Sequence, residues 1–524
     1  MVAGSTAPSE PETDIRAAGY ERALGRLRIA ALALSFGLLL LVAAAGPSAG
    51  KPGLGPRGWA PGDLPIALSS AVVTALLWTA YLLGASAVAL GLWRGLGSGY
   101  VPGGLSRTRS GRLFRLWPLA LAALALLTAP IGSADHTNYA AYGRIAAQGG
   151  DPYVVPPITW AGGLDPVTSA VEPPWTMTPS VYGPFATALQ TLSSLVGQDN
   201  LRQTVWVWQL FIVAAWLLVR FLLRRAAVDG RARARIDLLW TANPLIFGVA
   251  VLGAHVDLIA TALALAALHL ASRRPWVAGL VLAAAVSTKI TYGIVGLAIL
   301  WSWRTLASKA LVRNVSALAV SSLTVFVVLH LWAGPHVFEQ LAKASKGVSL
   351  VTAWRPVVNL LSAVMPLDAA RTVVSVASTL TVVVLAWMLA HLIRSRSIEA
   401  TSQTQQTQSA ITATFVLATA YALGTPYALP WYDTLTWSLL PLMLSTALDG
   451  ILLARLTVMA MAYVPGRVVA MSPQVESLTL GFRKLVGPLA AWLVWLAIVR
   501  VVRRGRPRLR PNPQSQGASR PQAS

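Results

Sequence analysis

The sequence predicts an all-α protein that crosses a lipid bilayer about 14 times, with some of its helices short or broken. Of the 524 residues, 55% are hydrophobic and only 12% are charged, which is unusual for a soluble globular chain. Apolar runs of roughly 17 to 25 residues recur along nearly the whole chain, and each is long enough to cross a hydrocarbon core. The basic residues, which give a net charge of +23, gather in short clusters between these runs. Such clusters are typical of loops on the cytoplasmic side and not of a nucleic-acid-binding face.

The first part of the chain predicts a tail and three spans. Residues 1–28 are polar and end in several arginines, so we expect a disordered cytoplasmic tail. Apolar runs follow at 29–46, 66–92 and 115–132. The loop between the second and third spans carries Arg94, Arg107, Arg109 and Arg112, which predicts a return to the cytoplasm and an exit of the third span on the external face.

A polar segment, 133–205, then forms a large predicted external loop. Loops of this length in compact proteins usually carry function. The chain re-enters at 206–224 and meets a dense arginine cluster between Arg220 and Arg235. We therefore place that end of the fourth span on the cytoplasmic side.

Two broken helix pairs are predicted next, each between basic clusters that return to the cytoplasm. Gly253-Ala254-His255 interrupts the first apolar stretch and Ser287-Thr288-Lys289 the second. We call these interruptions the first and second elbows. Irregular backbone at membrane depth is tolerated where it lines a cavity or is packed in protein, so we expect both elbows to face the external side and to belong to a site.

The remaining spans complete an even number of crossings. They are expected at 314–333, 372–393, 410–427, 434–449, 451–465 and 485–502. The whole of 29–502 is thus one predicted multi-span domain. The strongly basic segment that opens 503–524, expected to be a disordered tail, agrees with a cytoplasmic end.

Polar residues at the external ends of spans are the candidate site. Asp135 directly follows the third span, and its carboxylate is either a general base toward a hydroxyl or an N-cap. Lys289 either binds a lipid-linked phosphate or snorkels to the interface. His255 and Asp257 form either a metal pair or a satisfied elbow. Trp431-Tyr432-Asp433 lies where an aromatic belt would also occur.

An ordered set of short motifs resembles one family. It comprises Asp135-His136-Thr137-Asn138-Tyr139 with Tyr142 and Arg144, then Gly150-Asp151-Pro152-Tyr153, Ser180-Val181-Tyr182-Gly183-Pro184, Asn243-Pro244-Leu245, Gly253 to Asp257, Ser287-Thr288-Lys289, and Leu429 to Asp433. In this order they resemble the polyprenol-phosphate-mannose-dependent α-1,6-mannosyltransferases of lipomannan and lipoarabinomannan assembly, over roughly residues 115 to 450.

The resemblance implies a GT-C-type fold and an inverting transfer of mannose from polyprenyl-phosphate mannose to a mannan or lipoglycan acceptor at the external face of the plasma membrane. Asp135 would be the general base, and Lys289 and Arg355 would bind the donor phosphate. Sugar-binding roles fall to His136, Tyr139, Tyr142, Arg144, Asp151, Tyr153, Tyr182, His255, Asp257, Trp431, Tyr432 and Asp433. The resemblance also makes the first two spans an accessory addition.

Two alternatives stay open. The chain resembles a wider superfamily that includes transferases for other sugars, such as arabinofuranose, and a transporter or flippase of lipid-linked sugars would also be polytopic. Membrane lipids are expected partners, and nucleic acid is not. We expect no cofactor and no metal ligands, although a divalent metal is left open.

Overall fold

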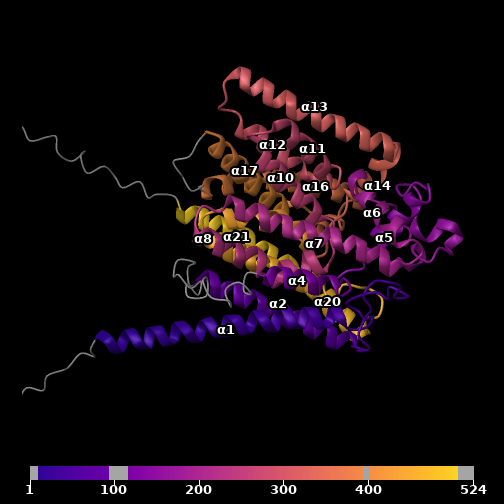
Figure 1. Cartoon of the computed structure of the whole chain (residues 1–524), viewed down its shortest axis with the longest axis horizontal. Helices are drawn as coiled ribbons and strands as arrows, with labels where there is room; N and C mark the ends of the chain where they lie inside the picture. Colours follow the sequence, from indigo (N-terminus) through magenta and orange to yellow (C-terminus); the bar gives the residue numbers. More distant parts are fainter. Residues whose placement is uncertain (1–9, 94–115, 394–401, 506–524) are drawn as a thin grey trace, which may run out of the picture.

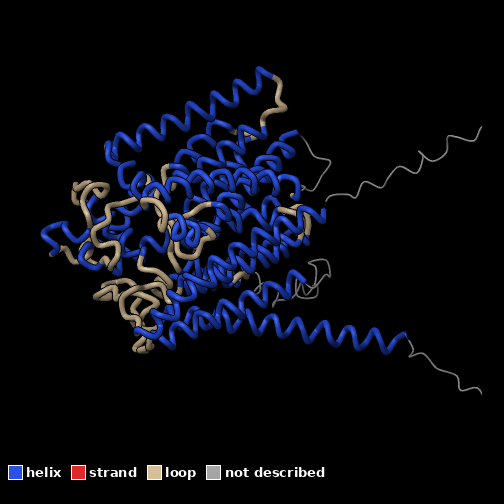
Figure 2. Tube along the Cα trace, turned by 180° about the vertical axis from the view of Figure 1, so that it is seen from behind, coloured by secondary structure: helices blue, strands red, loops and turns tan. Residues whose placement is uncertain are grey.

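The computed structural model describes residues 10–93, 116–393 and 402–505. Within these ranges every regular element is helical, apart from one isolated β-bridge between Ser48 and Lys51. The helices run between two opposite ends of the molecule (Figure 1). We call them the α5 end, which carries α5 (Asp135–Ala147) and α6 (Pro184–Gly197), and the α8 end, which carries α8 (Gly230–Ile236). Most of the loops gather at the α5 end (Figure 2).

Seven helical stretches in the described ranges are long and apolar enough to span a membrane. They are Arg22–Ala44 of α1 (Glu10–Ala44), α2 (Ser70–Trp93), α7 (Leu201–Ala226), Gly230–Leu252, α13 (Ser308–Ala333), α16 (Leu367–Leu392) and Pro473–Arg504. Four shorter apolar stretches are α4 (Trp117–Leu126), α10 (Asp257–Ala271), α11 (Pro275–Val286) and Ile290–Ser302, which joins η5 (Ile290–Tyr292) to α12 (Gly293–Ser302). The predicted all-helical, multi-pass membrane fold is confirmed, while the count of about 14 crossings stays a prediction.

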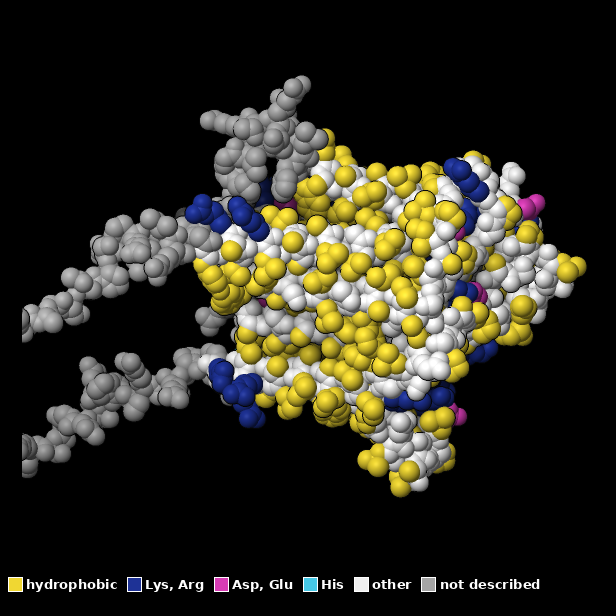
Figure 3. Space-filling model, turned by 90° about the horizontal axis from the view of Figure 1, so that it is seen from below, with side chains coloured by type: hydrophobic (Ala, Val, Ile, Leu, Met, Phe, Trp, Pro, Cys, Tyr) yellow, Lys and Arg dark blue, Asp and Glu magenta, His cyan; other side chains and the backbone are white. Residues whose placement is uncertain are grey.

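The outer surface fits a lipid environment. On the face seen in Figure 3, apolar side chains cover the region between the two ends, and Lys and Arg side chains gather at the ends themselves. α13 lies at the edge of the bundle (Figure 1), and only 6% of its apolar window is buried inside the protein. A helix that is apolar and yet so exposed is stable only against lipid or another apolar partner.

Both predicted elbows are present. Gly230–Leu252 contains α8, the π-helix η3 (Asp237–Thr241), α9 (Pro244–Ile246) and the π-helix η4 (Phe247–Leu252). The first elbow separates η4 from α10, and Ala254 has a positive φ of 52° there. The second elbow separates α11 from η5. α10 starts at the first elbow and runs through the centre of the core, with most of its residues buried.

The interpretation of the first two spans as accessory is wrong. Tyr81 of α2 is 1% exposed and lies against Gly248 of η4. The Trp78 indole donates a hydrogen bond of 3.0 Å to the carbonyl of Met461, in α19 (Ala447–Tyr463). Because α2 packs against both η4 and α19, it belongs to the same core that holds the first elbow.

The prediction of a single span at 434–449 is also wrong. The segment divides into α18 (Thr434–Leu439), the short 3-10 helix η8 (Leu440–Leu442) and a non-helical stretch that ends where α19 begins. Pro441 explains the end of α18, since a proline within a helix removes a backbone donor. Thr446 then caps α19 by accepting a hydrogen bond from the Leu448 amide.

Part of the tail expected to be disordered is helical, and the segment expected as a large external loop contains short helices. Residues 10–28, expected to be disordered, form the first turns of α1, in keeping with their many helix-forming Ala, Arg, Glu and Leu residues. The segment 133–205 is folded: it contains α5, the 3-10 helices η1 (Pro157–Gly163) and η2 (Thr168–Ala170), α6 and the start of α7. The expectations for 1–9, for the arginines of 94–115 and for 506–524 lie outside the described residues.

The described part of the C-terminal half contains eight further elements. They are η6 (Pro335–Phe338), α14 (Glu339–Ala344), α15 (Trp354–Leu361), α17 (Ser402–Gly424), η7 (Pro430–Asp433), α20 (Pro473–Gly481), the π-helix η9 (Phe482–Val486) and α21 (Gly487–Gly505).

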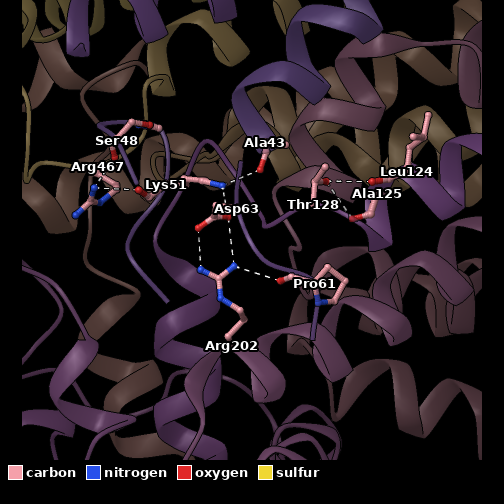
Figure 4. Close-up of polar contacts among 11 residues, drawn as sticks. Ala43, Ser48, Lys51, Pro61, Asp63, Leu124, Ala125, Thr128, Arg202 and Arg467 are labelled. Carbon is pink, nitrogen blue, oxygen red and sulfur yellow. Dashed lines mark hydrogen bonds and ion pairs between the residues drawn. The ribbon is translucent and has the colours of Figure 1, made fainter. Parts of the chain in front are cut away.

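A buried ionic network fixes the loop between α1 and α2 (Figure 4). Lys51 Nζ donates to Asp63 Oδ1 and to the Ala43 carbonyl, both at 2.7 Å, and Arg202 Nη2 lies 2.7 Å from Asp63 Oδ2. Burial alone would raise the pKa of Asp63, but its hydrogen bonds from Arg202 and Lys51 outweigh burial and lower that pKa. The loop is thereby tied to the start of α7.

Arg467 extends this network toward the site. Its guanidinium donates to the carbonyls of Ser48 and Lys51 and pairs with Glu172. Next to it, Gly466 meets the Gly132 backbone so closely that a Cβ would lie 2.2 Å from the Gly132 carbonyl. The segment that leads into α5 is therefore packed tightly against the backbone at Gly466.

Candidate active site

Two polar segments dock on the two elbows. The Ile131 amide donates to the Leu252 carbonyl at 2.9 Å, beside the first elbow. The amides of Gly183 and Phe185 donate to the carbonyls of Thr288 and Ser287, at 3.2 and 2.9 Å, on the second elbow. These contacts place the starts of α5 and α6 beside the two helix breaks. The two elbows are therefore brought together with the starts of α5 and α6, and their membership of a functional site stays a prediction.

Asp135 opens α5, and its carboxylate does not cap the helix. The N-cap residue is Ala134, with no side-chain cap. The Asp135 amide donates to Ser133 Oγ at 2.9 Å, and the Asp135 side chain is 18% exposed. The capping alternative is therefore excluded, and the carboxylate is left accessible at the junction of the two elbows.

His255 of the first elbow lies directly behind Asp135. Its Nδ1 is 3.4 Å from Asp135 Oδ2, and its ring stacks on Trp431 with centroids 3.5 Å apart and an interplanar angle of 13°. His255 is 1% exposed and Trp431 7%. Trp431 is thus buried against the first elbow and is not part of an exposed membrane-interface belt, and the His255 ring contacts both Trp431 and Asp135.

Lys289 of the second elbow is held inside the protein. Its ammonium lies 2.5 Å from Asp257 Oδ1 and 3.4 Å from the centre of the Tyr432 ring. These contacts exclude snorkelling, and they show that the Lys289 charge is already compensated. Asp257 Oδ2 is buried without a hydrogen-bond partner. Within the described ranges no group of three His, Asp or Glu side chains is arranged to hold a metal ion.

The expected aromatic platforms divide into exposed and buried rings. Tyr182 and Tyr432 are half-buried, so their rings can contact a ligand. Tyr139 and Tyr142 are buried and pack behind Tyr182, with centroid distances of 5.1 and 6.3 Å. Tyr153 is also buried, and its hydroxyl lies 2.7 Å from Thr187 Oγ1 of α6. The last three tyrosines therefore support the site from behind.

Three other expected sugar-binding residues are engaged elsewhere. Arg144 pairs with Asp165 at 2.8 Å and with Asp199. Asp433 is 2% exposed and accepts a hydrogen bond of 2.9 Å from Arg455. Asp151 Oδ2 lies 2.9 Å from His336 Nδ1, which joins the loop after α5 to η6. Their positions indicate structural roles.

His136 has no hydrogen-bond partner at either ring nitrogen and is 1% exposed. Burial lowers the pKa of His136 to about 3, and the neighbouring Asp135 offsets this only in part. The ring is therefore neutral near pH 7, and it cannot reach a sugar without a rearrangement of α5.

A third group of residues lies beyond Trp431. Tyr463 packs against Trp431 with centroids 6.1 Å apart. A narrow cleft here is lined by Ile131, His255, Trp431 and Tyr463, among others. Arg355 donates to the Val348 carbonyl, and its Nε is buried without a partner. Burial, with a smaller contribution from the nearby Arg371, lowers the pKa of the Arg355 guanidinium.

Sequence reasoning missed Tyr427, Tyr463 and Arg483. Tyr427 is half-buried, with its ring 6.2 Å from that of Tyr432. Arg483 lies over the Tyr463 ring at 4.9 Å. Of these three residues only Arg483 carried a usable signal, because a charged residue inside the apolar stretch 473–504 is a functional candidate by default.

The fold and the site together define a multi-pass membrane protein with an acid-and-histidine centre between two helix breaks, the arrangement expected of a membrane-embedded transferase. Residues 32–305 match the family model described as alpha-(1->6)-mannopyranosyltransferase, N-terminal domain, of the MptA/B family. This match covers more than half of the chain, so the chain belongs to that family of mannosyltransferases.

Individual relatives agree. The chain is 29% identical over 260 residues to alpha-(1->6)-mannopyranosyltransferase A of Mycobacterium tuberculosis, covering 48% of each protein. It is 31% identical over 267 residues to a probable alpha-(1->6)-mannopyranosyltransferase of Mycolicibacterium smegmatis, covering 43% of this chain and 45% of that protein. The matched part thus spans about half the length of these curated relatives.

One solved structure is also similar. It is the archaeal oligosaccharyltransferase AglB from Archaeoglobus fulgidus, in complex with an inhibitory peptide and a dolichol-phosphate. The identity is 14% and the TM-score 0.34, over 79% of this chain and 62% of that one. A likeness this low carries no argument about fold or function.

Proposed function

We propose that this protein transfers mannose from polyprenyl-phosphate mannose to a mannan or lipoglycan acceptor, forming an α-1,6 linkage, with Asp135 as the general base. The observation that carries this proposal is the position of Asp135. Its carboxylate is accessible, does not cap α5 and lies between two elbows that bring Lys289 and His255 close to it. Membership of the α-1,6-mannosyltransferase family supplies the sugar and the linkage.

The transfer is a single displacement. The acceptor hydroxyl oxygen attacks the anomeric carbon of mannose, the bond from that carbon to the phosphate oxygen breaks, and polyprenyl phosphate leaves. The acceptor proton goes to the Asp135 carboxylate. One displacement inverts a β-linked donor to an α-linked product, so no covalent sugar–enzyme intermediate forms.

Cations and aromatic faces complete the proposed site. The leaving phosphate gains charge and needs donors aimed at it. Arg355 is our first choice because no carboxylate in the described ranges lies within ion-pair distance of it. Lys289 would serve only by sharing its ammonium with Asp257. Tyr182 and Tyr432 are half-buried rings on which a sugar face can rest.

The reaction face follows from charge. The arginines at the ends of α7 and α21 lie at the α8 end, and loops rich in Arg and Lys stay in the cytoplasm. We therefore propose that the α5 end, with Asp135, faces the outside of the plasma membrane. Membrane lipids surround the span region.

The test is mannose transfer with purified protein in lipid nanodiscs. Wild type should transfer labelled mannose from polyprenyl-phosphate mannose to a synthetic α-1,6-dimannoside, and Asp135→Asn should reduce transfer by about 10²- to 10⁴-fold, the usual contribution of a general base. Asp199→Asn is the matched control, because Asp199 is 76% exposed and lies at the same end of the molecule. Full activity of Asp135→Asn would remove the base assignment. If the wild type transferred arabinofuranose and not mannose, the proposed donor sugar would be wrong.

A further inference from the structure

The buried arginines of this protein follow one pattern. Arg202, Arg235, Arg455 and Arg467 have side chains no more than 9% exposed, and each pairs with a carboxylate. A buried cation without a partner is costly, and so pairing is expected. An arginine that is partly buried without a carboxylate partner is therefore a candidate for binding an anionic ligand.

Arg355 and Arg483 depart from it at one place. Both are half-buried, and among the described residues no carboxylate lies within 4 Å of either guanidinium. Arg483 Nε donates to the Ala462 carbonyl at 2.5 Å, and Arg355 donates to the Val348 carbonyl. In addition, Arg355 Nε is buried without a hydrogen-bond partner.

The two arginines come together around Tyr463. Arg483 lies over the Tyr463 ring, and the Tyr463 hydroxyl is within electrostatic reach of both guanidinium groups. The chain segments that carry them are in direct contact, because a Cβ on Gly487 would lie 2.4 Å from the Val351 side chain and 2.9 Å from its Cα. Two guanidinium groups thus lie near the same tyrosine, and among the described residues neither forms an ion pair with a carboxylate.

This pair lies next to the proposed reaction centre. Tyr463 packs on Trp431, Trp431 stacks on His255, and His255 faces Asp135. Arg483 sits in η9, a π-helical turn between α20 and α21, and such turns interrupt helices frequently at functional sites. An anion bound by these arginines would therefore lie close to the proposed reaction centre.

We propose that Arg355 and Arg483 together bind the phosphate of a lipid-linked substrate, with Tyr463 holding the two guanidinium groups in position. Guanidinium groups match phosphate oxygens in charge and in fork geometry. Because Lys289 already forms an ion pair with Asp257, the two arginines neutralise the negative charge of the leaving phosphate. The identity of the lipid in this inference rests on the proposed function. The binding of a phosphate by the two arginines does not.

The test separates binding from catalysis. The affinity of a short-chain prenyl phosphate for purified protein in detergent is measured by isothermal titration for wild type, Arg483→Gln, Arg355→Gln and Arg483→Lys. Each Gln variant should bind at least about tenfold more weakly, as expected on losing a hydrogen bond to a charged group. The Lys variant should bind with intermediate affinity.

Arg57→Gln is the matched control. Arg57 is exposed, lies in the loop between α1 and α2, and donates to the Ala60 carbonyl, so this variant also removes one positive charge. It should bind prenyl phosphate as wild type does, and all variants should keep the melting temperature of the wild type within a few degrees.

Three results would overturn the inference: wild-type affinity in Arg483→Gln and Arg355→Gln, equal weakening in Arg57→Gln, or displacement of prenyl phosphate by phosphatidylglycerol at equal affinity, which would mark a general lipid-headgroup contact. If the binding pattern holds and no mannose is transferred to any acceptor, the proposed function fails and the phosphate site stands.

Discussion

At the scale of single residues, Asp135 and His255 form the centre of the site. Asp135 is accessible and His255 is not, so in the proposed reaction the carboxylate would meet the substrate and the imidazole would act through it. His255 Nδ1 lies 3.4 Å from Asp135 Oδ2 and has no hydrogen-bond partner among the described residues, and its ring is fixed by the stack on Trp431, so we propose that it orients the carboxylate during the reaction. We therefore regard His255 as a positioning residue and not as the sugar-binding residue expected from the sequence.

This role predicts a difference between two amide substitutions. The Asn side-chain nitrogen lies close to where Nδ1 of histidine lies, whereas the Gln nitrogen lies nearer to the Nε2 position. His255→Asn should therefore retain a large part of kcat, and His255→Gln should lose roughly 10-fold or more. Both should leave KM for the acceptor almost unchanged. Steady-state kinetics of the two variants checks this, and equal losses would show that the ring only fills space beside Trp431.

His136 predicts a pH dependence of stability. Its folded-state pKa is about 3 because burial disfavours the charged ring, against an ordinary value of 6.5. Between these values the unfolded chain binds a proton that the folded protein does not, so stability falls as the pH drops below about 6.5. His136→Leu removes this protonation, so the melting temperature of the variant should fall less between pH 7.5 and pH 5 than that of the wild type.

Intrinsic tryptophan fluorescence in detergent gives the melting temperatures for wild type and His136→Leu. His391→Leu is a suitable control, because His391 is exposed at the end of α16. Parallel slopes for wild type and His136→Leu would mean that other groups govern acid sensitivity.

At the scale of elements, the docking of α6 on the second elbow depends on Gly183. A Cβ at this position would lie 2.2 Å from the Ser287 carbonyl oxygen, a separation that backbone atoms cannot accept without moving. Gly183→Ala should push the start of α6 away from the elbow, misplace Tyr182 and lower kcat by about 10²-fold, the cost of a misplacement near 1 Å.

The control for Gly183→Ala is Gly293→Ala. Gly293 starts α12, close to the same elbow, and a Cβ there would meet nothing within 4 Å. This variant should keep full mannose transfer. If Gly183→Ala were equally active, the contact between α6 and the elbow would not position the site.

The elbows themselves could be predicted from the sequence, but their partners could not. Gly253 to His255 and Ser287 to Lys289 stand out because polar or small residues interrupt apolar runs that are too long for one span. The pairing of Asp257 with Lys289, or of Asp433 with Arg455, follows from how distant helices pack, and no local pattern encodes it. Arg355 and Asp135 were identified from position and resemblance, whereas Tyr463 had no signal beyond an ordinary interfacial tyrosine.

At the scale of the whole molecule, the chain's first and last described helices, α1 and α21, reach the α8 end (Figure 1). The apolar runs predict an even number of crossings, the basic clusters at both ends agree with it, and so does this arrangement. The first two spans were misinterpreted as accessory because the resemblance rested on motifs that begin after them, and no local pattern shows what α2 packs against. Tyr81 and Trp78 show that α2 is part of the core.

The orientation of the molecule leads to a prediction that the sequence makes unusually easy to test. The chain has no cysteine, so single introduced cysteines report their own surroundings. Leu164 is 86% exposed at the α5 end, and Val228 is 61% exposed between α7 and α8, at the α8 end. A membrane-impermeant maleimide should label L164C in intact cells and V228C only after permeabilisation, because arginine-rich loops stay in the cytoplasm. Wild type is the unlabelled control. The reverse pattern would place Asp135 on the cytoplasmic side. The face at which the donor binds, the acceptor and the proposed function would then all have to be revised.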